Sequence, residues 1–425
     1  MPLDAIVPPK QPERVMAAEG PVFISERQAP TAVPNGRRGS DRLLIDLVRD
    51  AATIRADWER LESDPLNSLH QSFGWCSIWA RTQNTPLLTL RGRRGGETVF
   101  LLPLEIVSEG GIRKAGFPGG RFNNINTGLF EASFAEREGE DIASAIAREA
   151  PKLLHGRADV LAFQNVPLIW RGRKNPLSHL ASVENQNPAF QLPLFDSFEA
   201  TLRQVNAKRR RKKFRIQRRR AEEMGGYSHI IARTQEEKCE ILQAFFRQKA
   251  ARFASQGIPD VFRDQGVKAF FHDLANLPEA ETDALLELHA IRLHGANEGV
   301  VAAIAGLSRK QDHIICQFGS IDEAASECSP GELLFWLMIE RACREKAALF
   351  DFGVGDQRYK RSWCPVFTVQ HDIFLALTLK GRVAASGYVA IARMKSMIKS
   401  SPALYTLIQR LRAGWRKTDT AAGTD

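Results

Sequence analysis

Residues 329–332 have the composition of a helix start that could also hold an anion. Ser329, Pro330 and Glu332 stand where an N-cap, a first-turn proline and the third residue of a capping box are favoured. Gly331 has no side chain, so a pyrophosphate could approach the free amides and the positive end of the helix. We therefore assign an anion site to Ser329, Pro330, Gly331 and Glu332, although a helix cap alone also explains these residue types.

A second candidate for chemistry follows a short apolar run at 349–352. Gly353 and Gly355 allow a sharp turn after a buried strand. Tyr359 would then lie one turn into a short helix, where its hydroxyl could give a proton to a leaving thiolate. The alternative is a buried tyrosine whose hydroxyl bonds to the backbone. The substrate side of the same cleft is assigned to Asp351, Asp356, Lys360 and Trp363.

Glu287 and His289 are the candidates for a general base. They alternate with Leu286 and Leu288, so they share one face of a strand expected over 284–293. A carboxylate or imidazole in a cleft could take a proton from an amine or hydroxyl. Side chains at such positions also commonly face solvent.

The positive charge of the chain is concentrated in one segment. The sequence carries 59 Lys and Arg against 49 Asp and Glu, and 208–220 alone holds ten basic residues and no acidic one. Without this run the two signs balance, so the excess does not describe the whole fold. The run could bind phosphates of nucleic acid or an anionic membrane. No aromatic platform accompanies it, so we favour a solvated helix face or a clamp for a phosphorylated ligand over nucleic acid.

The elements that must position these residues alternate between helices and strands. Apolar spacing, turn residues and helix stops predict both kinds of element in each half of the chain. Helices are expected over 51–62, 73–82, 141–154, 196–224, 236–255, 331–346 and 388–412, the last one basic and amphipathic. Strands are expected over 86–91, 98–107, 160–163, 284–293, 300–307, 313–318, 349–352 and 366–378.

Composition limits the class of protein. The 425 residues, 44% apolar and 25% charged, suit two globular domains, and no apolar run is long enough to cross a membrane. The six cysteines are scattered, which favours a reducing cytoplasm and gives no metal-ligand spacing. The first forty residues lack the apolar core of a secretion signal and are expected to be a disordered tail.

Three segments together resemble a known family. They are Asn206–Lys213, Ser329–Leu334 and Phe350–Trp363, and the last is the most specific. They resemble the GNAT-fold acyltransferases of the bacterial cellulose-biosynthesis CelD type, also called BioF2-like, which are related to the FemAB group. The usual GNAT pyrophosphate loop, Arg/Gln-x-x-Gly-x-Gly/Ala, is not present; the corresponding stretch is Glu327–Gly331.

The resemblance implies an α/β (α+β) fold of tandem GNAT-like mixed sheets flanked by helices. The expected parts are a tail (1–40), a degenerate GNAT-like domain (41–194), a GNAT acyltransferase domain (195–380) and a basic C-terminal helix and tail (381–425). The resemblance further implies acyl transfer from acyl-CoA, without a metal, to an amine or hydroxyl of a glycan precursor such as a sugar nucleotide. Two alternatives remain open: an aminoacyl-tRNA-dependent transferase, and a non-catalytic scaffold at the inner membrane.

Overall fold

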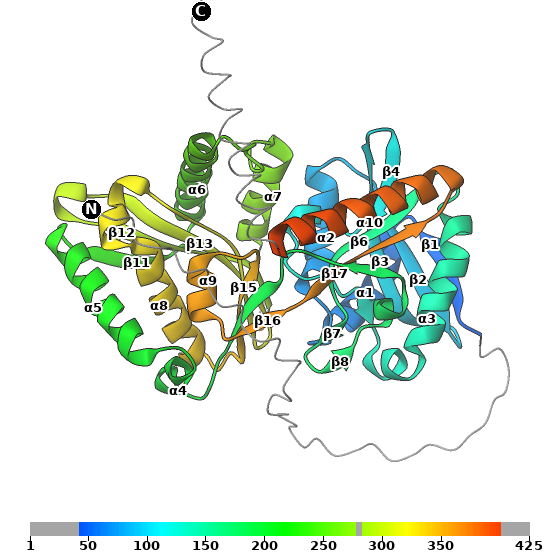
Figure 1. Cartoon of the computed structure of the whole chain (residues 1–425), viewed down its shortest axis with the longest axis horizontal. Coiled ribbons are helices and arrows are strands. Elements are labelled where there is room, and N and C mark those ends of the chain that lie inside the picture. The colour runs from blue at the N-terminus through cyan, green and yellow to red at the C-terminus, as the bar shows by residue number, and fades with distance from the viewer. Residues whose placement is uncertain (1–41, 278–282, 401–425) are drawn as a thin grey trace, which may run out of the picture. The chain divides into compact units, whose positions relative to one another are not determined.

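The computed structural model describes residues 42–277 and 283–400, and these form two mixed sheets flanked by helices (Figure 1). The first sheet has the strand order β1-β2-β3-β4-β6-β17-β9, with β5 paired to β3. Its strands are β1 (Leu44–Val48), β2 (Leu88–Arg94), β3 (Glu97–Glu109), β4 (Ile112–Gly116), β5 (Leu129–Phe130), β6 (Val160–Pro167), β9 (Ser182–Glu184) and β17 (Gln370–Ala376). The helix α3 (Ala132–Leu153) places Ile142 and Ile146 in the core of this sheet.

The second sheet has the order β11-β12-β13-β14-β15-β10-β16. Its strands are β10 (Ala189–Pro193), β11 (Tyr227–Ile231), β12 (Asp283–Leu293), β13 (Val301–Lys310), β14 (His313–Ile321), β15 (Leu349–Val354) and β16 (Val366–Thr368). Helices α6 (Gln235–Gln256) and α7 (Gln265–Asn276) contribute to the core on one face. On the other face lie α4 (Phe198–Arg203), α5 (Ala207–Glu223) and α8 (Pro330–Arg344), while α9 (Arg358–Trp363) follows β15.

The two sheets exchange segments of the chain. β10 precedes the helices of the second sheet and pairs there with β15 and β16. β17 returns to the first sheet, where it pairs with β6 and β9, and the helix α10 (Leu379–Ser400) packs against it. The helices α1 (Arg55–Glu62) and α2 (Phe73–Thr82) share a core with α6 and α7, in which Trp75 meets Phe270 with ring centroids 4.9 Å apart. The two halves of the chain are therefore joined in two ways: the chain crosses between the sheets, and helices from both halves share one hydrophobic core.

Most expected elements are present, but two of them are divided. The helix expected over 196–224 is two helices, because Asn206 leaves the helical conformation (φ −41°, ψ 84°) and its side chain caps α5 at the Arg209 amide. The strand expected over 366–378 is split between β16 and β17, which enter different sheets.

The helices expected over 141–154 and 388–412 begin earlier, at Ala132 and Leu379. The helix α7 and the strands β1, β4, β10 and β11 were not expected from the sequence. The predicted tail 1–40 and the end of the C-terminal helix beyond residue 400 lie outside the described residues.

Candidate active site

Strands β14 and β15 run parallel and then separate, which creates the candidate site. They pair only from His313–Leu349 to Ile315–Asp351, although both strands continue beyond these residues. The register between β13 and β14 shifts at this point: Leu307 is opposite Cys316 but Gly306 is opposite Phe318, so Gln317 is an extra, bulged residue. Bulges leave backbone groups unpaired and re-aim side chains, often beside active sites. The split therefore offers unpaired backbone groups to a ligand.

Asn124, from the first half of the chain, bridges the two separated strands. Its Nδ2 donates to the Cys316 carbonyl of β14 (3.2 Å), and its Oδ1 accepts from the Val354 amide of β15 (3.3 Å). Its carbonyl accepts from the Gln370 side chain (2.7 Å). Gly353 must be a glycine here, because it has φ +73° and an added Cβ would lie 2.5 Å from Asn124 Oδ1. Thus the first half of the chain holds the root of the split in place.

Replacing Asn124 with Ala is expected to lower the free energy of unfolding by about 1–3 kcal/mol. The substitution leaves the Val354 amide and the Cys316 carbonyl without their partners, while the bond from Gln370 to the backbone carbonyl of residue 124 remains. Urea denaturation measures the change. The exposed Gln243→Ala variant on α6 serves as the control and should change the free energy by less than about 0.5 kcal/mol. Equal stability of both variants would contradict the bridging role.

Tyr359 and Lys360 lie at the end of β15. The Tyr359 ring stacks on Phe335 of α8 (centroids 5.3 Å apart), and its hydroxyl has no hydrogen bond to another described residue. Burial raises the pKa of Tyr359 above its usual range, and the thiols of Cys316 and Cys364 raise this pKa further. The phenol therefore stays protonated near neutral pH. The Lys360 ammonium donates to the carbonyls of Val354 (2.8 Å) and Gly353 (3.1 Å), and so caps the strand end.

The start of α8 differs from the predicted capping box. Ser329 is the N-cap, but its backbone is left-handed (φ 50°, ψ 56°) and its side chain makes no cap hydrogen bond. The carbonyl of Ser329 accepts from the amides of Glu332 (3.1 Å) and Leu333 (3.3 Å). Pro330 is buried and has no amide hydrogen, so within the described chain only the Gly331 amide of this turn is left without a partner. The helix start offers one backbone donor to an anion.

Glu332 points toward α5 and is neutralised there. Its Oε2 accepts from Arg210 Nη1 (2.7 Å), and Arg210 Nη2 donates to Ser362 Oγ (2.6 Å). The guanidinium also lies over the Trp363 ring, 3.9 Å from its centroid. Burial lowers the pKa of Arg210, and the Glu332 carboxylate opposes this shift. The carboxylate that would repel a phosphate at Gly331 is therefore paired with a buried cation.

The two candidates for the general base, Glu287 and His289, already contact other side chains through their polar atoms. His289 is 1% exposed; its Nε2 contacts Glu287 Oε2 (2.8 Å) and its Nδ1 contacts His229 Nε2 (3.0 Å). Arg341 binds both Glu287 oxygens at 2.6 and 3.1 Å. Although burial opposes it, the bonds from His289 and Arg341 hold the pKa of Glu287 well below its usual range. Arg341 lies in the last turn of α8, about 16 Å along the helix from Pro330, so the structure does not bring this pair to Gly331.

Of the four residues assigned to the substrate side, Asp351, Lys360 and Trp363 are buried. Asp351 is fully buried at the root of the split, where its Oδ1 accepts from the Gly353 amide (2.6 Å). Lys360 caps the end of β15, as described above. Asp356 pairs with Arg361. Trp363 is 1% exposed beneath Arg210 and presents no surface to a substrate.

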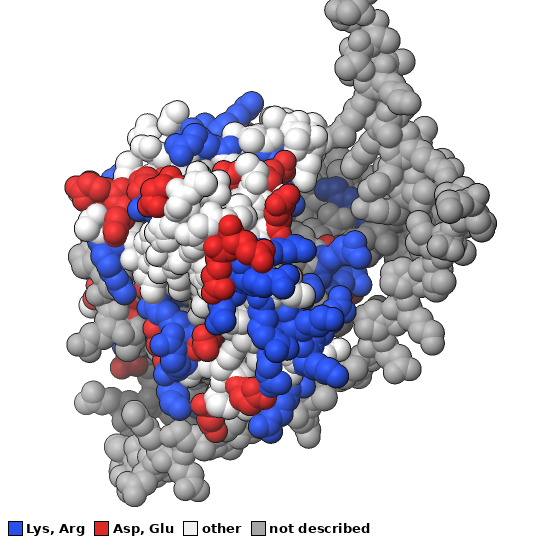
Figure 2. All heavy atoms as spheres, turned by 90° about the vertical axis from the view of Figure 1, so that its left-hand side faces the viewer, with Lys and Arg blue, Asp and Glu red and all other residues white. Residues whose placement is uncertain are grey.

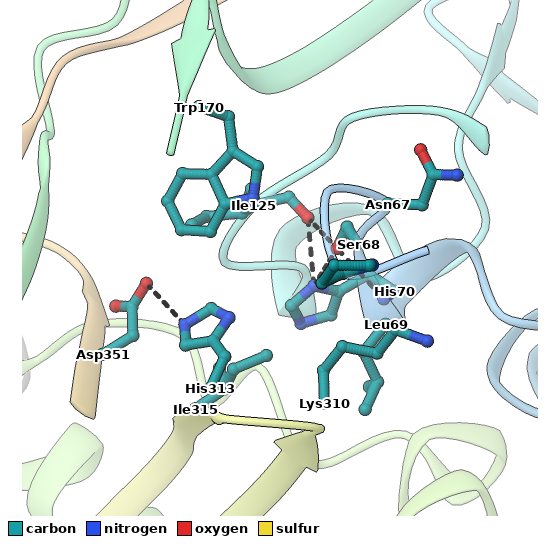
Figure 3. Close-up of a pocket in the computed structure, with 11 residues that line it drawn as sticks. Asn67, Ser68, Leu69, His70, Ile125, Trp170, Lys310, His313, Ile315 and Asp351 are labelled. Carbon is teal, nitrogen blue, oxygen red and sulfur yellow. Dashed lines mark hydrogen bonds and ion pairs between the residues drawn. The ribbon is translucent and has the colours of Figure 1, made fainter. Parts of the chain in front are cut away.

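A small cavity with both polar and apolar walls lies at the root of the split, between the second sheet and the first half (Figure 3). Its volume is about 10 Å³, enough for one water molecule. His313 Nε2 lies 3.6 Å from Asp351 Oδ2 and is buried without a hydrogen bond in the described structure. Gln191 donates to the same Asp351 oxygen (3.0 Å). The His313 imidazole therefore lies beside the Asp351 carboxylate, which Gln191 holds in place, and beside a space for one water molecule.

His70 closes this cavity from the first half. Its Nδ1 lies 3.0 Å from the Ile125 carbonyl, and its Nε2 lies 3.2 Å from Oε1 of the bulged Gln317. Burial lowers the pKa of His70 to about 4. The imidazole is therefore neutral, has one N–H, and can donate at only one of these two contacts at a time.

Stability is expected to fall when the pH drops from 6.5 to 4, partly because of His70. In this window the unfolded chain binds a proton that folded His70 does not, which favours unfolding. A folded pKa of about 4 corresponds to roughly 3 kcal/mol, fully present above pH 6.5. Urea denaturation between these pH values should show a shallower decline for His70→Gln. The exposed His155→Gln variant is the control, and a decline identical in both would contradict the assignment.

Lys249 on α6 was not expected from the sequence. It is half-buried, lies 5.8 Å from the ring centroids of both Phe245 and Phe253, and makes no ion pair or hydrogen bond within the described residues. Burial and the nearby Arg252 guanidinium together lower the pKa of Lys249 to about 8. The thiol of Cys316 on β14 acts in the opposite direction. Periodicity assigns Lys249 only to a helix, so no sequence signal separates it from other lysines.

The basic segment forms α5, and its cations are mostly exposed. The inner side packs on α8, with Phe214 stacked on Trp336 (centroids 4.4 Å apart). Arg220 donates to the Glu327 carbonyl (2.8 Å), which places this helix beside the turn before α8. Figure 2, which faces this side of the molecule, shows Lys and Arg side chains gathered together. The exposed members on α5 are Lys208, Arg209, Arg211, Lys212, Arg215, Arg218, Arg219 and Arg220.

The described residues contain neither a candidate metal site nor a candidate membrane-spanning helix. Between 42 and 400, leaving out 278–282, no group of three or more His, Cys, Asp and Glu side chains could hold a metal ion. None of the helices in the same residues combines the length and apolar character needed to cross a membrane.

Known proteins are similar to this chain in sequence or in structure. Residues 208–361 match the family model described as Acetyltransferase (GNAT) domain. The crystal structure of FemX superposes with a TM-score of 0.55 at 12% identity, covering 78% of this chain and 97% of that one. The C-terminal domain (DUF2156) of a putative lysylphosphatidylglycerol synthetase from Agrobacterium fabrum gives 0.48 at 10% identity, covering 82% and 97%. A tandem GNAT protein from the clavulanic acid pathway gives 0.42 at 12%, covering 78% and 97%. No curated protein matches.

The family match and the likeness to FemX agree with the two sheets described above. The chain has a mixed α/β fold of two mixed sheets flanked by helices, with the GNAT match over residues 208–361, and this confirms the fold class expected from the sequence. The matched segment runs from α5 through β14, α8 and β15 to α9. The split between β14 and β15 therefore lies inside the GNAT segment.

Proposed function

We propose that the protein transfers an acyl group from acyl-CoA to an amine or hydroxyl, with a sugar nucleotide or polysaccharide precursor as acceptor. The observation that carries the proposal is the split between β14 and β15, with the bulged Gln317 on one side and Tyr359 at the other. Amide groups along an acyl-CoA arm can pair with backbone groups that the separated strands leave unpaired. The family model matched to residues 208–361 supports a transferase of this type.

In this proposal Tyr359 serves the leaving group. Its protonated hydroxyl donates to the sulfur as negative charge develops there and the carbon–sulfur bond breaks. The ring is held by Phe335 and Phe352, so the hydroxyl does not have to be ordered during the reaction. The Gly331 amide and the amine of Lys249 are the groups we assign to the anionic part of the donor.

The acceptor's proton passes to His313 in this proposal. A water in the 10 Å³ cavity would connect the acceptor to His313 Nε2, and Asp351 would stabilise the imidazolium that forms. Glu287 and His289 are not used, because Arg341 and His229 already occupy their polar atoms.

Calorimetric titration with CoA and acetyl-CoA tests the donor. The proposal expects micromolar binding that a Gly331→Glu variant weakens at least about tenfold, because the new carboxylate would repel the phosphates. The Gly387→Glu variant on α10 is the control for the added charge. A Cβ at Gly387 would meet no atom within 4 Å, whereas a Cβ at Gly331 would lie 2.9 Å from Ile321 Cγ2. Absence of binding by a folded wild-type protein would overturn the proposal.

A second candidate is transfer from an aminoacyl-tRNA, favoured by the exposed cations of α5. It expects tRNA binding that weakens steeply with salt and is lost when Arg215 and Arg219 are changed to Glu. It also expects no thiol release from acetyl-CoA. We favour the acyl-CoA reaction because the split lies within the matched GNAT segment.

We place the protein in the cytoplasm, with peripheral contact to an anionic inner membrane. The described part of α10 supports this contact, since Ile391, Met394 and Met397 are exposed near Arg393 and Lys395.

A further inference from the structure

The first half of the chain contains a cavity larger than the one at the split. Its volume is about 220 Å³, and it is bounded by the start of α3, the segment before α2 and the hairpin of β7 (Ile169–Trp170) and β8 (Arg173–Lys174). Asn67 and Trp170 line both this cavity and the water-sized one beside His313. The two spaces are therefore neighbours with a common wall.

The hairpin holds Trp170 in that wall. Arg171 and Gly172 have φ values of 49° and 81°, the left-handed pair that a two-residue type I′ turn needs. Arg171 is bound at both guanidinium ends to Asp312, each bond 2.7 Å long, and Asp312 is the residue before His313. As a result the Trp170 ring lies 5.4 Å from the His313 ring, visible in Figure 3. The hairpin thus connects the large cavity to the second sheet.

The groups that line the large cavity favour an anionic ligand with a ring. Lys174 is exposed and makes no ion pair within the described residues, and the His179 imidazole has no hydrogen bond there. Arg173 shares its charge with Glu136 (2.9 Å). The first amides of α3 are bonded to the Glu131 carboxylate, so side chains must recognise the anion. Trp170 and Phe130 supply flat apolar walls, which suit the apolar face of a sugar ring.

We infer that this cavity binds a phosphorylated sugar, with the phosphate on Lys174, Arg173 and His179 and the ring toward Trp170. The inference rests on the proposed function in taking this ligand as the acceptor. The acceptor would then approach the split from the first half, across the wall that Trp170 forms, while the donor occupies β14 and β15. In this arrangement the acceptor binds to the first half of the chain, where the sequence predicts a degenerate GNAT-like domain.

Calorimetry on the full chain with glucose 1-phosphate, glucose and inorganic phosphate tests this inference. Glucose 1-phosphate should bind at least about tenfold more tightly than either of the other two, because only it offers both the charge and the ring. Lys174→Glu should raise its Kd at least about tenfold by reversing the charge beside the phosphate. The control Lys152→Glu, on the exposed side of α3, should leave the Kd within about twofold.

Three results would overturn it: no binding of glucose 1-phosphate, an equal affinity for inorganic phosphate, or equal effects of the two lysine variants. Thermal unfolding of both variants shows whether each is folded. Titration with CoA separates the two proposals, since Lys174→Glu should bind CoA as the wild type does. If the protein binds the sugar phosphate through Lys174 but does not bind CoA, the sugar phosphate site is supported and acyl-CoA is excluded as the donor.

Discussion

Replacing Tyr359 with Phe is expected to lower kcat for acyl transfer about 10²–10⁴-fold. The substitution removes the hydroxyl and keeps the ring, which stacks on Phe335 and lies tilted beside Phe352. Packing at the split should therefore persist, and the Kd for CoA should stay within about threefold of the wild-type value. Thiol release from acetyl-CoA measures the rate, and calorimetry measures the affinity.

The control for this result is Tyr388→Phe, which removes a hydroxyl from α10 beside the first sheet. Its kcat should be unchanged. An unaltered kcat in Tyr359→Phe would contradict the assignment, because another group would then serve the leaving sulfur. A large loss of CoA affinity with little loss of kcat would also contradict it, since Tyr359 would then bind the donor and not act on the leaving group.

Replacing Arg210 with Ala is expected to lower the free energy of unfolding by about 3–5 kcal/mol, as for other buried ion pairs that lose one partner. Arg210 is 5% exposed and connects Glu332 of α8, Ser362 and the Trp363 ring. The substitution leaves the Glu332 carboxylate without its close cation, since Lys213 Nζ lies 4.0 Å away and is partly exposed. Urea denaturation measures the loss.

Two variants make this result specific. Arg209→Ala removes an exposed guanidinium from the preceding position and should cost less than about 0.5 kcal/mol. The double variant Arg210→Met with Glu332→Met removes both charges and should recover most of the loss, because no charge is then buried alone. Equal costs for Arg209→Ala and Arg210→Ala would show that the ion pair does not stabilise the fold.

Sequence patterns predicted a helix or strand well where its capping residues and apolar spacing lie within the element itself. The helix at 73–82 was expected with its observed bounds, because Ser72 caps it and its apolar residues recur at helical spacing. The strands at β12, β13 and β14 were recognised from their apolar runs. The break at Asn206 was missed because both flanking segments favour helix, and only the capping bond to Arg209 separates them.

The site was only partly accessible from the sequence because its contacts join distant segments. The alternation of Glu287 and His289 was real, but the pattern could not show that Arg341 of α8 would bind them. Likewise, no periodicity reveals that Asn124 and His70 reach the second sheet, where they contact Cys316 and Gln317. The left-handed Ser329 also looks like an ordinary N-cap in sequence. Residue types and local spacing therefore identified candidate site residues. Contacts between distant segments determine which side chains surround each candidate.

A crystal structure of the protein with bound CoA tests the central claim most directly. Our account expects the CoA sulfur between β14 and β15, within about 3.5 Å of the Tyr359 hydroxyl, a distance compatible with a hydrogen bond to sulfur. It also expects the phosphates near Gly331 and Lys249. CoA bound along the exposed face of α5, with the split between β14 and β15 closed by side chains, would contradict the account.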